Sequence, residues 1–217
     1  MLLALLALTV SQTATGEEPI ALQYYVTDSQ GILSQSDVTD LEDLLFAIQN
    51  QTSAEFAVDI VNTTAPLSIE QFAVRTFEMS QLGQRGVDNG VLLVVAVGDH
   101  RWKIEIGYGL EGVLNDAKVG NIGRTYLEPS FESGDYGDGI YNAMYAMGVE
   151  VAGSDLAKPA DFPIPGVPLN SWQLGVAIVV VIILFVVTRG GIFLWVFGLF
   201  RKGGGGRSGG GGAGGDW

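Results

Sequence analysis

Val91-Leu-Leu-Val-Val-Ala-Val97 is a continuously apolar run, followed by Gly98-Asp99-His100 and then by Arg101-Trp-Lys-Ile-Glu-Ile-Gly-Tyr108. An unbroken apolar, β-branched run is typical of a strand that is covered on both faces. In the second run apolar and charged residues alternate, which predicts a strand with one partly exposed face. Together with the turn between them, the two runs predict a hairpin whose first strand is the centre of a sheet.

Helices are predicted before and after this hairpin in the sequence. The apolar residues from Val38 to Ile48 follow helical spacing, and Ser68 to Gln71 has the spacing of a capping box that opens a second helix. Between these helices, Glu55 to Ile60 alternates as a strand does. Further helices are expected around 117–127 and 139–151. The order of elements predicts an α/β fold, specifically an α/β/α sandwich over residues 20–155.

The composition excludes several kinds of site. The 217 residues include no Cys and one His, His100, and the formal net charge is −13. Disulfides, thiolate metal sites and Cys nucleophiles are therefore absent, and a bound metal should be a hard ion with oxygen ligands. Because an acidic domain repels phosphate backbones, nucleic acid is not an expected partner.

Two apolar segments predict a membrane-anchored protein. Leu2 to Val10, within residues 1–16, resembles the apolar region of a secretory signal, and an uncleaved interfacial anchor is the alternative. Residues 172–200 are long enough to span a bilayer as a single transmembrane helix. Arg201 and Lys202 follow that segment, which predicts its cytoplasmic end. We therefore expect the domain on the extracytoplasmic or periplasmic side of the inner membrane, on a proline-containing linker at 156–171.

Arg189 and the glycine-rich tail leave alternatives open. Either one long tilted helix carries Arg189 inside the bilayer, where the charge needs a partner in another subunit or a lipid headgroup, or the span ends near Arg189. Residues 201–217 are mostly glycine and predict a flexible cytoplasmic tail. The tail could also be a hook for a partner that ends in Trp217.

Four parts of the domain together resemble the TPM domain family. They are Val26-Thr-Asp-Ser-Gln-Gly-Ile-Leu33, Asp88-Asn-Gly-Val-Leu-Leu-Val-Val-Ala96, Glu105-Ile-Gly-Tyr-Gly-Leu-Glu-Gly-Val-Leu-Asn-Asp116, and Pro129-Ser-Phe131 with Gly134-Asp-Tyr136. The resemblance covers residues 24–151 and implies a Rossmann-like domain. Bacterial members of the family commonly continue into a membrane helix and a glycine-rich tail, as this sequence does.

The resemblance also implies a calcium-type site in the turns that flank the strands. The acidic and amide residues of these turns are Asp28, Asp88, Asn89, Glu111 and Asp116. Calcium takes oxygen ligands of these kinds from converging loops. Each residue also has a structural interpretation, because Asp28 and Asp88-Asn89-Gly90 suit turns and Asp116 suits the cap of a helix.

Two functions are consistent with these features. The first is an accessory or scaffold subunit that stabilises or helps to assemble a larger membrane complex, photosynthetic or respiratory, with Arg189 as its contact to other subunits and to lipid. The second is a metal-dependent acid phosphatase, which the resemblance to a plant relative implies. Since the sequence lacks a Cys nucleophile and a second His, we favour the accessory subunit.

Overall fold

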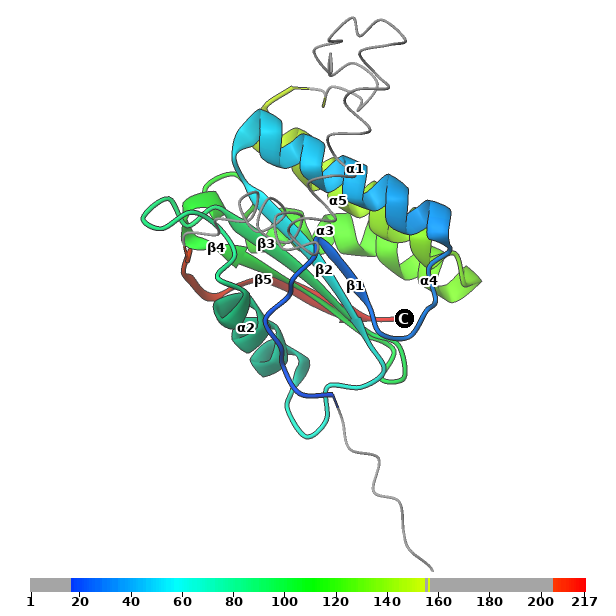
Figure 1. Ribbon diagram of the computed structural model, residues 1–217. Coiled ribbons are helices and arrows are strands. Elements are labelled where there is room, and N and C mark those ends of the chain that lie inside the picture. Colours follow the sequence, from blue (N-terminus) through cyan, green and yellow to red (C-terminus); the bar gives the residue numbers. More distant parts are fainter. Residues whose placement is uncertain (1–16, 155, 157–204) are drawn as a thin grey trace, which may run out of the picture.

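The structure, a computed structural model, describes residues 17–154, 156 and 205–217. A mixed sheet with the strand order β1-β2-β3-β4-β5 has helices on both faces (Figure 1). The strands are β1 (Val26–Asp28), β2 (Glu55–Val61), β3 (Gly90–Ala96), β4 (Arg101–Gly107) and β5 (Ser208–Asp216). β1, β2 and β3 are parallel, whereas β4 is antiparallel to both of its neighbours. The predicted α/β class is confirmed.

The hairpin predicted from residues 91–108 is present, and β3 is the central strand. Every residue of β3 is buried, as expected of a strand with helices over both faces. In β4, however, Lys103 is 6% exposed and Glu105 is 0% exposed. The prediction of a partly exposed face on this strand is therefore wrong, because α2 packs against β4 and β5 pairs with its outer edge.

The helices begin where the sequence supplies caps. The side chain of Ser34 caps the first helix and forms a capping box with Asp37, and Ser68 caps the second helix in the same way with Gln71. The helix expected around 117–127 is present, but at Gly123 it changes from an α-helix to a π-helical turn. The helices are α1 (Gln35–Thr52), α2 (Ile69–Ser80), η1 (Tyr108–Leu110), α3 (Asp116–Ile122), η2 (Gly123–Leu127), α4 (Glu128–Ser133) and α5 (Tyr136–Ala152).

The two faces of the sheet are covered unequally. Phe56, Val58 and Ile60 of β2 pack into the larger core with α1 and α5, whereas Ala57 and Val61 pack on the other face with α2. α1 and α2 therefore lie on opposite faces, as Figure 1 shows. The connections β1-α1-β2 and β2-α2-β3 both step to the next strand in the same direction across the sheet, but they pass over opposite faces. The two connections therefore have opposite hands, and one of them departs from the usual right-handed crossover.

The glycine-rich tail forms β5, so the prediction of a flexible tail is wrong. Ser208–Asp216 pairs antiparallel with the whole of β4, in the register Arg101 with Asp216 and Gly107 with Ser208. Glycine weakens a strand intrinsically. Here the strand forms because β4 offers an unpaired edge, whose backbone groups gain hydrogen bonds when a strand is added.

Other predictions fall on residues that the structure does not describe. The segments 1–16 and 172–200, nearly all of the linker 156–171, and Arg189 lie outside the described residues. Within residues 17–154, 156 and 205–217, no helix is both long and apolar enough to cross a bilayer.

Candidate functional site

The outer edge of β4 holds the glycine-rich strand through side chains as well as through the sheet. We call this set of side chains the strand site; its members are Asp88, Arg101, Lys103, Glu105 and Asp116. β5 runs along them between α2 on one face of the sheet and α3 on the other. The site therefore lies at the antiparallel edge of the sheet, beyond the parallel strands β1, β2 and β3 (Figure 1).

Three carboxylates of the strand site accept hydrogen bonds from the backbone of the tail. Asp88 Oδ1 accepts from the N–H of Arg207 at 2.9 Å, and Asp116 Oδ1 accepts from the N–H of Gly212 at 2.8 Å. Glu105 Oε1 accepts from the N–H of Gly210 at 3.0 Å and from the hydroxyl of Ser208 at 2.6 Å. Hydrogen bonds to ionised acceptors are stronger than neutral ones. The acidic side chains therefore satisfy N–H groups of a strand that has few side chains of its own.

A buried ion pair supports these contacts. Lys103 Nζ lies 3.6 Å from Glu105 Oε2, and their side chains are 7% and 0% exposed. Lys103 also donates to the carbonyl oxygen of Gly211 at 3.4 Å. Burial raises the pKa of Glu105, while the Ser208 hydroxyl and the Lys103 ammonium act in the opposite direction. Each charge needs the other, because an unpaired charge at this depth is costly.

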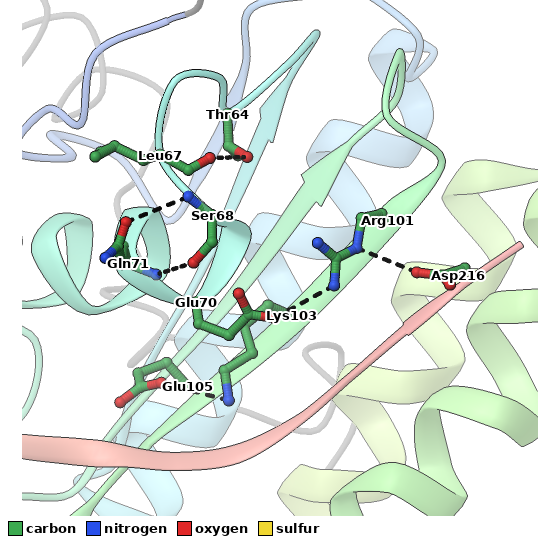
Figure 2. A network of polar contacts seen from close by, with 9 residues as sticks. All are labelled: Thr64, Leu67, Ser68, Glu70, Gln71, Arg101, Lys103, Glu105 and Asp216. Carbon is green, nitrogen blue, oxygen red and sulfur yellow. Dashed lines mark hydrogen bonds and ion pairs between the residues drawn. The ribbon is translucent and has the colours of Figure 1, made fainter.

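Arg101 forms two exposed ion pairs near the end of β5. Arg101 Nε donates to Asp216 at 3.1 Å, and Arg101 Nη2 donates to Glu70 of α2 at 3.3 Å. Figure 2 shows Arg101 between these two carboxylates, with Lys103 and Glu105 further along β4. Arg101 therefore ties the last residues of the tail to α2.

Trp217 packs against His100, Phe131 and Tyr136. We call these four residues the aromatic cluster. The ring of Trp217 lies 4.7 Å from the ring of Phe131 and 5.4 Å from that of His100, measured between centroids. Its backbone N–H donates to the carbonyl oxygen of His100 at 3.2 Å. Tilted and edge-on aromatic contacts of this kind stabilise packing beyond the buried area. His100, predicted as a loop residue, thus lies in a loop that contacts the end of the tail.

Of the five residues predicted as calcium ligands, Asp88 and Asp116 belong to the strand site. Glu111 lies next to the tail, since a Cβ atom on Gly211 would be 3.0 Å from its Oε1. Asp116 does not cap α3 as one interpretation proposed, because the cap is Asn115, whose side chain accepts from the N–H of Lys118. The Asp116 carboxylate is therefore available to the tail.

Asp28 and Asn89 stabilise loops elsewhere. Asp28 accepts from the backbone N–H groups of Gln30, Gly31 and Leu33, which is the predicted turn role. Asn89 accepts from the N–H of Gln84 and donates to the carbonyl oxygen of Ser53. Asp28 is the last residue of β1, at the opposite edge of the sheet from β5. Among the residues that the structure describes, no group of three or more His, Asp or Glu side chains is placed to hold a metal ion, and the calcium site stays a prediction.

Sequence reasoning missed Arg101, Lys103 and Glu105 as binding residues. Their alternation with Trp102, Ile104 and Ile106 was interpreted as solvent exposure. The one available indication was their position beside the central strand, because the neighbour of a fully buried strand is itself expected to be largely covered.

Asp59 is a separate buried acid on β2. Its side chain is 1% exposed, and Oδ2 has no hydrogen-bond partner among the described residues. It lies beside a cavity of about 240 Å³ that Glu17, Thr27 and Phe72 also line. Burial, together with the nearby charge of Glu17, raises the pKa of Asp59 to about 7.

We predict that Asp59→Asn removes a pH dependence of stability. Because the folded state keeps the Asp59 proton up to a pH of about 7 while the unfolded chain releases it near its ordinary pKa, stability falls as the pH rises between these values. Each unit of pKa difference corresponds to about 1.4 kcal/mol. The variant should therefore be more stable than the wild type at pH 8 by a few kcal/mol and nearly equal to it at pH 4, in urea unfolding curves. The exposed Asp43→Asn is the control, and an equal gain from it would contradict the prediction.

Comparisons with known proteins agree on the body of the domain. The family model of the TPM domain matches residues 26–150. A UPF0603 protein of Mycobacterium tuberculosis is 28% identical over 138 residues, which are 63% of this chain and 20% of that protein. The chain thus spans about a fifth of the length of this curated relative. A solution NMR structure of the N-terminal domain of a P. gingivalis protein is 31% identical, with a TM-score of 0.53, and the match covers 59% of this chain and 82% of that one. β5 lies outside the residues that the family model matches.

Proposed function

Because the chain belongs to the TPM domain family, we propose that it acts as a membrane-anchored accessory subunit whose domain holds a glycine-rich strand at the edge of its sheet. Strand addition to an open edge is an established mode of protein recognition, in which backbone hydrogen bonds give affinity. The role is one of binding and assembly within a larger membrane complex, photosynthetic or respiratory, and it involves no turnover of a substrate.

The observation that carries this proposal is the strand site itself. The carboxylates of Asp88, Glu105 and Asp116 all accept from backbone groups of residues 207–212. Carboxylates that bind a peptide backbone are not arranged as metal ligands, and this supports a binding role over the alternative, a metal-dependent acid phosphatase. The apolar segments 1–16 and 172–200 support the anchoring part of the proposal, with the domain on the extracytoplasmic side.

Co-purification from native membranes tests the proposal. We expect mild detergent to extract the full chain together with a stoichiometric partner, and Arg189→Gln to weaken that association, because Arg189 is proposed to contact other subunits or lipid. Arg207→Gln is a control outside the apolar segment. Extraction of a monodisperse monomer, under conditions that keep other membrane complexes intact, would contradict the accessory role.

The phosphatase alternative makes a different prediction. Purified full-length protein would then hydrolyse a phosphomonoester when Mg²⁺ or Ca²⁺ is added, and Asp116→Ala would abolish the activity. The same measurement with Asp43→Ala, which removes an exposed acid of α1 outside the predicted metal site, separates a metal ligand from a general loss of acidic surface.

A further inference from the structure

The positions along β5 differ in how much space they leave for a side chain. A Cβ atom on Gly212 would overlap the carbonyl oxygen of Ile104, and one on Gly214 would lie 2.9 Å from the carbonyl oxygen of Trp102. At Gly215, a Cβ atom would lie 2.9 Å from the Trp102 ring and 2.7 Å from Glu128 Oε1. Backbone atoms of a sheet cannot move aside as the end of a flexible side chain can. Gly212 and Gly214, which face backbone atoms of β4, therefore favour glycine over other residues.

Trp217 is recognised by different chemistry. Its ring packs against His100, Phe131 and Tyr136. Just before it, Asp216 pairs with Arg101. A large aromatic anchor such as tryptophan is typical of the residues that dominate binding at interfaces.

We propose that the strand site is a peptide receptor that selects a glycine-rich strand followed by Asp-Trp, and that residues 207–217 are its ligand. Glycine at the positions facing backbone atoms and tryptophan after the strand are both required for binding. The inference rests on the proposed function, because it names the strand that the strand site holds.

A peptide added in trans tests this selectivity. The receptor is the full-length protein in which Gly212→Ala and Trp217→Ala weaken the attachment of its own tail and leave the strand site unchanged. The probe is a synthetic peptide with the sequence of residues 207–217 and a fluorophore at its N-terminus, and fluorescence anisotropy gives its affinity. We expect the variant to bind the probe at least about ten-fold more tightly than the wild type does, because the wild-type site is filled by its own tail.

Altered peptides give the specificity. A peptide with alanine at the position of Gly212, or with alanine in place of the terminal tryptophan, should bind about ten-fold more weakly or worse. A peptide with alanine at the position of Gly211 is the matched control, because the atom nearest to a Cβ there is Glu111 Oε1, 3.0 Å away at the end of a flexible side chain, and it should keep most of the affinity. Equal binding of all the peptides would overturn the selectivity but would leave the accessory role in place. Failure of every peptide to bind, in a protein that still co-purifies with a partner, would overturn the receptor and again spare that role.

Discussion

Replacing Gly212 with alanine should release the tail from the sheet. The backbone of Gly212 has φ +105°, and its added Cβ atom would overlap the carbonyl oxygen of Ile104. A left-handed conformation costs a non-glycine residue about 1–2 kcal/mol, and a forced overlap costs about 1–3 kcal/mol more. In hydrogen–deuterium exchange, amides of residues 208–217 that are protected in the wild type should therefore exchange about a hundred-fold faster or more, as local opening becomes easier.

Gly210→Ala separates the steric effect from the conformational one. Gly210 also has a positive φ, +81°, but a Cβ atom there meets nothing within 4 Å. Only the conformational cost remains, so exchange in the tail should rise by about ten-fold. Equal exchange in the two variants would mean that the close approach to Ile104 does not hold β5 in place.

Replacing Glu105 with glutamine should destabilise the whole domain. Glutamine keeps an oxygen that can accept from the N–H of Gly210, but it removes the charge that faces Lys103. Removing one partner of a buried pair leaves the other charge uncompensated and typically costs about 3–5 kcal/mol. The midpoint of urea unfolding, followed by circular dichroism, should therefore fall clearly, with no change in the slope of the transition.

Two further variants test whether the unpaired charge of Lys103 causes the loss of stability. Lys103→Met combined with Glu105→Gln removes both charges, so stability should return towards the wild-type value if the unpaired lysine is responsible. Glu70→Gln breaks the exposed pair with Arg101, and exposed pairs contribute about 1 kcal/mol or less. A double variant no more stable than Glu105→Gln alone would show that the ion pair is not the reason for the loss.

Much of the fold was predictable because its signals are local. The apolar run of β3 and the capping boxes at Ser34 and Ser68 depend on neighbouring residues alone. Helices on both faces were predicted, but the strand order β1-β2-β3 with α1 and α2 on opposite faces could not be, since the general rule for crossovers favours a single hand.

The strand site was predictable only in part. Asp88 and Asp116 were selected as calcium ligands because they lie in turns beside strands, and in the structure both accept hydrogen bonds from the tail. Their ligand was missed, because a run of glycine has neither the periodicity nor the propensity of a strand. The strand becomes stable only through contacts with β4, Glu105 and the aromatic cluster, which are about a hundred residues away in the chain.

The pairing of β5 with β4 also constrains membrane topology. Two hydrogen-bonded strands occupy the same compartment, so a copy folded as described has its domain and its C-terminus on one side of the bilayer. The predicted single crossing, with Arg201 and Lys202 at its cytoplasmic end, would separate them. In a copy with that topology the edge of β4 would be open, and a second copy with the same topology could not fill it, because its tail too would lie on the opposite side of the bilayer. The side of the membrane that Trp217 occupies therefore decides whether the domain can hold the strand of its own chain.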